Sequence, residues 1–242
     1  MAVPSPSPPI RLLGDRALVV EFGRSAELAV NRRVRAFAER LLLDPLPGVT
    51  DVVPGYACVT VHYDPLALRE AHPGLDVIEA LSQQLLARVA RSAAEPRRRP
   101  RTVEIPVCYG GDHGPDLAEL ARHCGLDPIE VVRLHTAPEY EVYMLGFVPG
   151  FAYLGGLDRR LAMPRRTSPR KRVPSGSVAV GGAQTGVYPL ETPGGWNLLG
   201  RTPLGLTRLD REEMPGLLQP GDRVRFVAID AGAFGRLEAT AS

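Results

Sequence analysis

The sequence of 242 residues has few cysteines and no long hydrophobic run. No apolar stretch approaches the roughly 20 residues that a membrane-spanning helix needs. Cys58, Cys108 and Cys124 are widely spaced, and none belongs to a Cys-x-x-Cys pair of the kind found in zinc and redox sites. The first nine residues have neither the basic nor the apolar region of a secretory signal. We therefore expect a soluble, cytoplasmic protein with reduced thiols and no metal site.

An excess of charge of one sign is also missing. The chain carries 29 Lys and Arg against 27 Asp and Glu, a net charge of +2, which gives no field strong enough to indicate nucleic-acid binding. Three catalytic signatures are absent: the Gly-x-x-x-x-Gly-Lys-[Ser/Thr] phosphate loop, Gly-x-Ser-x-Gly and His-Glu-x-x-His. The sequence therefore predicts no self-contained hydrolase site, and any ATP is not held by a phosphate loop.

The first part of the chain alternates strand and helix patterns. Residues 18–22 and 57–63 alternate apolar and polar side chains as half-buried strands do, and apolar residues recur at helical spacing over 30–41 and 78–89. We expect a disordered tail over 1–9 and a small α+β domain over 10–91. Residues 92–101 hold two prolines and four arginines without apolar periodicity, which is typical of a linker.

A second domain over residues 102–242 is predicted to be mainly β. A strand is expected at 103–107, with Pro106 indicating an edge or a bulge. Short helices are expected over 116–124, ending at Gly125, and from Asp127 to Thr136. His135 lies in the last turn of the second helix, where the helix dipole favours the imidazolium. After Tyr140 no helical pattern of useful length remains, and the turns rich in Gly and Pro predict a small barrel or sandwich.

Three segments of this second domain could carry chemistry. Residues 140–157 interleave aromatic side chains with glycines, which is compatible with a small-molecule cleft but, from composition alone, favours an aromatic core. The basic run 164–174 is a solvated loop, a phosphate or nucleic-acid patch, or a set of arginine clamps for a carboxylate. Residues 175–189 offer backbone N–H groups and hydroxyls, so they form either an anion-binding nest or a pair of hairpin turns.

The order of motifs in this region resembles the allophanate hydrolase subunit 1 family, also described as the kinase-inhibitor KipI family or as the B subunits of 5-oxoprolinase. The resemblance is carried by Gly110-Gly111, Gly114-Pro115-Asp116-Leu117, His135, Gly146 to Leu157, Pro164-Arg165, Pro169-Arg170, Val173 to Val178, Gln184-Thr185-Gly186 and Pro193 to Thr202. It implies an α+β N-terminal domain followed by a cyclophilin-like β-barrel.

In function, the resemblance implies one component of an ATP-dependent 5-oxoprolinase, inactive without its partners. The complex would open 5-oxo-L-proline to L-glutamate together with a related barrel protein, similar to the C subunit of that enzyme, and a protein similar to its A subunit. Activation of the lactam by phosphorylation of its carbonyl oxygen would make ATP the required nucleotide. Neither the residues nor the resemblance indicates where in this chain ATP would bind, nor what the N-terminal domain does.

Site residues follow from the same resemblance. Arg165, Arg170 and Arg201 would clamp the substrate carboxylate or a phosphate, because charge develops on oxygen atoms during this reaction. The remaining expected contacts are Gln184 and Thr185 to the lactam, His135 for proton transfer or orientation, and Phe147, Phe151 and Tyr153 as cleft walls. His135, Arg201 and Gln184 are the catalytic candidates. Alternatively, His135 caps its helix and Arg201 belongs to a structural ion pair.

Two other functions remain open. One is a binding module that inhibits a sensor histidine kinase, as the KipI name implies. The other is a carboxyltransferase-like protein related to allophanate and urea degradation, which the lack of a biotin carboxylase or biotinyl segment in this sequence disfavours.

Overall fold

The computed structural model describes residues 9–25, 27–91, 99–207 and 216–241. By its contacts the chain divides into two units, Met1–Arg99 and Pro100–Ser242. The expected tail, apart from Pro9, and residues 92–98 of the expected linker lie outside the described ranges. No helix within those ranges is long and apolar enough to cross a membrane.

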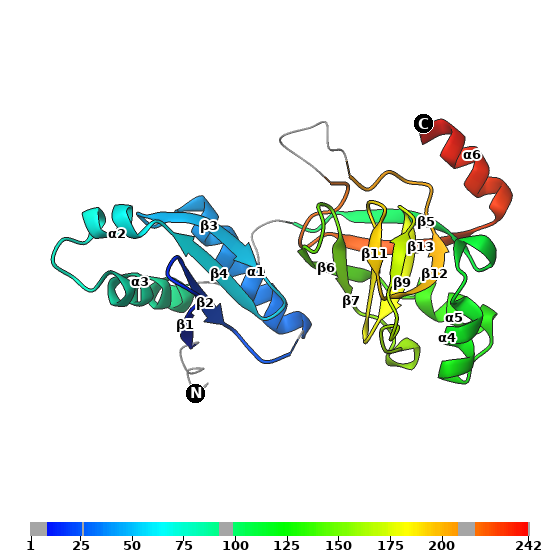
Figure 1. Ribbon diagram of the computed structural model, residues 1–242, viewed down its shortest axis with the longest axis horizontal. Coiled ribbons are helices and arrows are strands. Elements are labelled where there is room, and N and C mark those ends of the chain that lie inside the picture. Colours follow the sequence, from blue (N-terminus) through cyan, green and yellow to red (C-terminus); the bar gives the residue numbers. More distant parts are fainter. Residues whose placement is uncertain (1–8, 26, 92–98, 208–215, 242) are drawn as a thin grey trace. The chain divides into compact units, whose positions relative to one another are not determined.

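The first unit combines a four-stranded antiparallel sheet with helices (Figure 1). The strand order is β1-β2-β4-β3. The elements are β1 (Ile10–Leu12), β2 (Ala17–Glu21), α1 (Leu28–Leu43), β3 (Val49–Pro54), β4 (Cys58–Tyr63), α2 (Pro65–Ala71) and α3 (Val77–Arg91). The strands expected at 18–22 and 57–63 and the helices expected at 30–41 and 78–89 are confirmed as β2, β4, α1 and α3.

Alternation along β4 explains how this unit builds its core. Val59, Val61 and Tyr63 point to one face of the sheet and are at most 3% exposed. Phe37 of α1 and Leu81 of α3 belong to the same buried cluster, so both helices cover that face. The apolar stripe of each helix is therefore buried against one side of the sheet, as its spacing predicted.

The second unit is a closed barrel, which confirms the expectation of a mainly β domain. The strands run β10-β7-β6-β13-β5-β12-β9 around the barrel, and all neighbours are antiparallel except β5 and β13. Their bounds are β5 (Thr102–Tyr109), β6 (Tyr140–Leu145), β7 (Ala152–Gly155), β9 (Ser177–Gly181), β10 (Gln184–Val187), β12 (Asn197–Arg201) and β13 (Arg223–Ile229). A separate two-stranded sheet joins β8 (Arg170–Val173) to β11 (Thr192–Gly194).

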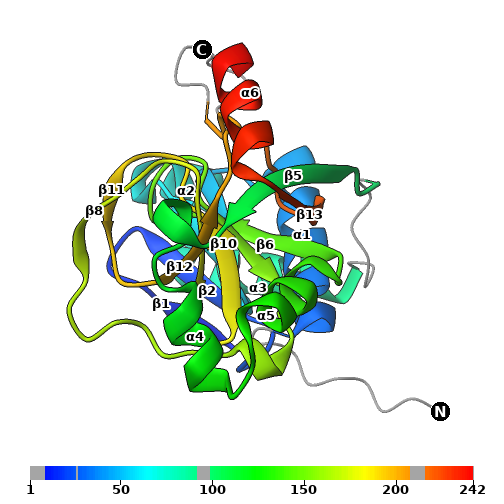
Figure 2. The ribbon, with the colours of Figure 1, turned by 90° about the vertical axis from the view of Figure 1, so that its right-hand side faces the viewer.

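Two short helices pack on the barrel as the sequence predicted (Figure 2). The first, α4 (Leu117–Cys124), ends at Gly125, whose φ of 67° is a left-handed conformation that suits glycine. The second, α5 (Pro128–Thr136), is capped by Asp127, whose side chain accepts the Glu130 backbone N–H at 2.8 Å. Single helical turns occur at η1 (Gly111–His113) and η2 (Arg159–Leu161).

Two local predictions were wrong. A helix, α6 (Ala231–Ala241), follows β13, although glycines weaken its helical pattern. Asp230 caps it by accepting the Ala233 N–H at 2.7 Å, and the buried Phe234 ring lies 4.2 Å from the His113 ring, so packing replaces propensity. The strand β5 is also not an edge strand, because it lies between β13 and β12; its pairing with β12 involves Cys108 and Tyr109 and does not reach Pro106.

Candidate functional site

An aromatic cavity of about 280 Å³ opens on the second unit. Its lining comes from the loop between β6 and β7, from β7, from the segment before β8 and from the turns around β11. The lining residues are Phe147, Phe151, Tyr153, Arg165, Arg166, Pro169, Tyr188, Pro193, Gly194, Gly195 and Trp196. Three expected wall residues and one expected arginine therefore share one cavity.

The Phe151 ring is the centre of the aromatic wall. It makes edge-to-face contacts with Tyr153 at 4.8 Å, Tyr188 at 5.2 Å and Trp196 at 5.5 Å between ring centroids. Such contacts add to the energy of burial and fix the rings relative to one another. The rings form a small core, as composition favoured, and one side of that core lines a cavity; binding of a small molecule there stays a prediction.

Glycines allow this close packing. A Cβ on Gly181 would lie 2.6 Å from the Trp196 ring, and one on Gly194 would lie 2.4 Å from the Tyr188 hydroxyl oxygen. Neither distance is compatible with a side chain at the glycine. The glycines thus set the position of the two rings on the cavity wall.

Arg165 is the exposed cation of the cavity. Its guanidinium carbon lies 5.7 Å from the centroid of the Trp196 ring, within range of a cation–π interaction. Burial raises the pKa of the Tyr153 phenol, and the positive charge of Arg165 opposes that rise. The cavity therefore combines an apolar wall with two guanidiniums, that of the exposed Arg165 and that of the partly exposed Arg166, a combination suited to a small ligand with a carboxylate.

Phe147 stands at the cavity in a strained conformation. Its φ is 71°, and it is the one non-glycine residue with positive φ in the described part of the chain. Its side chain is 60% exposed, while its ring still contacts those of Phe151 and Tyr188 edge-on. Strain of this kind in an exposed aromatic residue is common at ligand sites.

A buried carboxylate holds the arginines behind the cavity. Asp116 is 3% exposed and accepts two hydrogen bonds from Arg170, at 2.7 and 2.8 Å. It also accepts the Leu198 backbone N–H at 2.7 Å and lies 3.3 Å from Arg166. Because Arg170 is engaged in this bidentate pair, its guanidinium is oriented before any ligand arrives.

His135 lies elsewhere, on α5 against the barrel strands, and is completely buried. The Thr185 hydroxyl donates to the Ala179 carbonyl at 3.0 Å, so its oxygen accepts from His135 Nε2 at 2.9 Å. His135 Nδ1 then accepts from the Tyr109 hydroxyl at 2.7 Å. The network assigns the neutral tautomer protonated on Nε2, with both ring nitrogens satisfied by the protein.

The expectation that the helix dipole favours the His135 imidazolium is wrong. Desolvation by burial lowers the pKa of His135 from 6.5 to about 3, so the ring is neutral at neutral pH. The ring stacks on Phe226 with centroids 4.7 Å apart, an apolar contact that offers no counter-charge. Burial outweighs the modest stabilisation that a helix terminus provides.

The other two catalytic candidates lie apart from the aromatic cavity. Arg201 donates from Nε to the Ser175 carbonyl at 2.8 Å, lies 3.7 Å from Glu238 and stacks near Phe234. Gln184 begins β10, next to Thr185, and is partly exposed. Arg165, Arg170 and Arg201 thus have three different sets of partners and do not form one clamp within the described chain; their contact with substrate stays a prediction.

The sequence as a whole matches known proteins. The chain matches the carboxyltransferase domain, subdomain C and D, over residues 8–218. It belongs to this family. Two relatives carry the name of the B subunit of 5-oxoprolinase: that of Bacillus subtilis, 46% identical with 91% of this chain and 92% of that protein covered, and that of Escherichia coli O157:H7, 48% identical with 89% and 94% covered.

Two solved structures are similar to this chain. The crystal structure of TTHA0988 superposes with a TM-score of 0.75 at 42% identity and covers 89% of this chain. This chain spans 40% of the TTHA0988 chain. The K. lactis urea amidolyase has a TM-score of 0.76, with 97% of this chain and 16% of that chain covered, but at 19% identity it shows a shared fold alone.

Sequence reasoning missed several residues around the site of this carboxyltransferase-domain protein. Asp116 was expected to begin a helix and to belong to a motif of the resemblance, without a role at the site, and Arg166 and Tyr109 were not singled out. Arg170 and Asp116 are 54 positions apart, and His135 and Thr185 are 50 apart, so no local pattern links them. The described residues contain no group of three or more His, Cys, Asp or Glu that could hold a metal ion.

Proposed function

We propose that this chain is the B subunit of a 5-oxoprolinase, a hydrolase complex that opens 5-oxo-L-proline to L-glutamate with hydrolysis of ATP. One observation carries the proposal: relatives of that name are 39–48% identical to this chain over about nine tenths of their length. Similarity of this extent covers both structural units rather than one motif. It supports the same place for this chain in the same complex.

The reaction needs an activated amide. Transfer of the γ-phosphoryl group of ATP to the lactam oxygen gives an imidate phosphate and ADP. Water then attacks the ring carbon, the C–N bond breaks and the nitrogen takes up a proton, which leaves an acyl phosphate. A second water hydrolyses this acyl phosphate to inorganic phosphate and the second carboxylate of glutamate. Negative charge is present on the substrate carboxylate throughout and on phosphoryl oxygens during transfer, so cationic hydrogen-bond donors favour both steps.

The aromatic cavity is the place in this chain where we propose that the substrate binds. A five-membered lactam is small and partly apolar, which suits walls formed by Phe151 and Tyr153, and its carboxylate suits Arg165. Arg166 lines the same cavity, and its buried Nε is a donor without an acceptor among the described residues. Because that Nε has almost no accessible surface, it offers no contact to a ligand in the cavity, and the exposed Arg165 carries the proposal.

The remaining candidates receive supporting roles in this proposal. Arg170 stays paired with Asp116 and positions the arginine segment that reaches the cavity. His135 is proposed to position Thr185, because both of its ring nitrogens are already bonded and a group with a pKa near 3 is a poor proton donor at neutral pH. Gln184 and Arg201 would contact the lactam, its intermediate or a partner surface.

Assembly with two further proteins completes the proposal: a related barrel protein, similar to the C subunit of 5-oxoprolinase, and a protein similar to its A subunit. ATP would be used by the complex, with its binding site shared or supplied by a partner. We further propose a cyclophilin-like topology for the barrel and a cytoplasmic location, where Cys58, Cys108 and Cys124 would stay reduced, as the free thiols of the structure are.

The test is reconstitution. The chain is purified with its two candidate partners, assembly is checked by size-exclusion chromatography, and glutamate release from 5-oxo-L-proline is measured with and without ATP. Arg165→Gln removes the cavity cation, whereas Arg172→Gln, on an exposed arginine of β8 paired with Glu191, is the matched control. We expect kcat/KM to fall by about 10- to 100-fold in the first and to stay unchanged in the second.

Two results would contradict the proposal at different points. An assembled complex that releases no glutamate would exclude the 5-oxoprolinase function and favour the sensor-kinase alternative. An Arg165→Gln complex as active as the wild type would leave the function intact and remove the cavity from it. A role in urea degradation is not proposed, since the likeness to urea amidolyase concerns the fold alone.

A further inference from the structure

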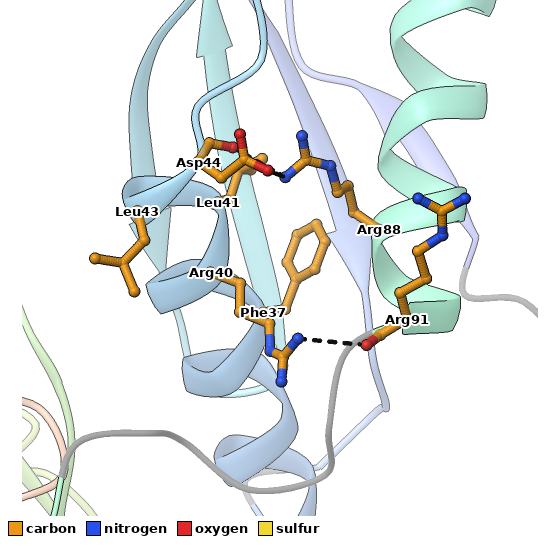
Figure 3. Close-up of a pocket in the computed structure, with 7 residues that line it drawn as sticks. All are labelled: Phe37, Arg40, Leu41, Leu43, Asp44, Arg88 and Arg91. Atoms are coloured by element: carbon orange, nitrogen blue, oxygen red, sulfur yellow. Dashed lines mark hydrogen bonds and ion pairs between the residues drawn. The ribbon is translucent and has the colours of Figure 1, made fainter.

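A second cavity, of about 320 Å³, lies within the first unit between the C-terminal ends of α1 and α3 (Figure 3). Arg40 from α1 and Arg88 and Arg91 from α3 line it, and Phe37 and Leu41 contribute apolar surface. Its volume falls within the usual range for small-ligand sites. The proposed function assigns nothing to this unit.

The arginines of this cavity have different contacts. Arg88 binds Asp44 through both the side-chain carboxylate and the backbone carbonyl, the latter at 3.0 Å. Arg40 donates from Nη1 to the Arg91 carbonyl at a long 3.4 Å. The Arg40 Nε is buried and has no hydrogen-bond partner among the described residues. This Nε has almost no accessible surface, so a ligand in the cavity would reach Arg40 through its terminal Nη atoms, one of which has the long bond to the Arg91 carbonyl.

The charges around the cavity define the missing group. The lining holds three guanidiniums and one carboxylate, that of Asp44, which is 73% exposed. All three arginines lie in the last turns of their helices, where each helix terminus contributes about half a negative charge. The three guanidiniums, less the Asp44 carboxylate and the two helix C-termini, leave a surplus of roughly one positive charge. A single negative charge on two coplanar oxygens matches both this surplus and the bidentate geometry of guanidinium.

We propose that the cavity between α1 and α3 binds the carboxylate of a small molecule, with Arg40 as the principal contact and Arg88 and Arg91 beside it. The apolar surface of Phe37 and Leu41 accommodates the carbon skeleton of the ligand. The site lies entirely within the first unit and is separate from the aromatic cavity of the second. It is therefore independent of the 5-oxoprolinase assignment.

The test uses the uniformly ¹⁵N-labelled full-length chain at constant ionic strength in chloride. Benzoate, its neutral isostere benzamide, and inorganic phosphate are titrated separately, and backbone amide shifts are followed by NMR. We expect benzoate to cause saturable shifts at the C-terminal turns of α1 and α3, benzamide to cause none there, and phosphate to bind more weakly than benzoate.

Variants then assign the contact. Arg40→Gln should raise the Kd for benzoate by about tenfold, and Arg40→Lys should restore little of it, because lysine keeps the charge but not the bidentate geometry. Arg69→Gln, on the exposed face of α2, should bind as the wild type does. Absence of benzoate shifts in these turns, equal affinity in Arg40→Gln, equal shifts from benzamide, or tighter binding of phosphate would each overturn the proposal.

Discussion

The two cavities of this protein both contain arginines, and each has one arginine whose buried Nε lacks a partner among the described residues. The two cavities differ in the burial of the carboxylate that pairs with their arginines. In the second unit Asp116, almost fully buried, fixes Arg170 and touches Arg166. In the first unit the corresponding carboxylate, Asp44, is mostly exposed. The buried carboxylate Asp116 holds its arginines in one orientation, whereas the exposed carboxylate Asp44 leaves the arginines of the first cavity available to a ligand.

Removal of the buried carboxylate should have the largest effect. Asp116→Asn leaves Arg170 without its charged partner and weakens the bond to the Leu198 N–H, so we expect the free energy of unfolding of the second unit to fall by about 3–5 kcal/mol. Hydrogen exchange of the full-length chain, read separately for the two units, measures this. A loss below about 1 kcal/mol would show that burial of Asp116 does not organise the arginines.

Low pH should lower the free energy of unfolding of the second unit more than that of the first, by slightly less than the Asp116→Asn substitution does. The pKa of His135 is lowered in the folded state, so protons bind preferentially to the unfolded state below pH 6.5, and stability falls as the pH falls from 6.5 toward 3. At pH 4 the loss is about 3 kcal/mol for the second unit.

Unit-resolved hydrogen exchange between pH 7 and pH 4 tests this dependence, with His135→Gln as the comparison. The glutamine variant starts less stable, because it loses ring contacts, but its second unit should show a flatter pH dependence. An unchanged slope in the variant would assign the acid sensitivity to other groups.

The two cavities also differ in backbone strain. Among the described residues, Phe147 of the aromatic cavity is the one non-glycine residue with positive φ. Phe147→Gly and Phe147→Ala both remove the ring, but only glycine adopts a φ of 71° without cost. We expect the glycine variant to be more stable than the alanine variant by about 1 kcal/mol, measured by urea denaturation. Equal stability would mean that this loop relaxes in the alanine variant.

The smallest effect is expected in the first unit. Asp44→Asn removes the charge of an exposed partner, so the free energy of unfolding should change by less than about 0.5 kcal/mol. The same substitution increases the positive surplus of the cavity and should tighten benzoate binding, as NMR titration would show. A large loss of stability would mean that exposed and buried carboxylates act alike here, which would remove the contrast between the cavities.

Local patterns in the sequence predicted much of this fold. Apolar periodicity located α1 and α3, a glycine marked the end of α4, and Asp127 marked the start of α5. These patterns did not reveal α6, whose helix depends on the packing of Phe234 rather than on its own periodicity. The short edge strands β1 and β3 were missed because their burial pattern is weak: β1 holds one partly buried and two exposed residues.

The candidate site also contains residues that local sequence patterns predicted and residues that they did not. Its aromatic wall was predictable because Phe147, Phe151 and Tyr153 are close in the sequence. The pairing of Asp116, before α4, with Arg170 of β8 was not predictable, because contacts between positions far apart in the sequence leave no local signal. His135 was correctly singled out but its charge was not, since complete burial is a property of the folded barrel and not of its helix.

Closure of the barrel by the parallel pairing of β5 with β13 has a consequence for synthesis. Arg101 and Asp222, which form an ion pair beside the start of these strands, are 121 positions apart. The ribosome therefore releases β5 long before β13 exists, and β5 lacks this neighbour until Arg223–Ile229 has emerged. The first unit, whose contacts lie within its own residues, can fold earlier and leave only one half of the polypeptide in need of protection from aggregation.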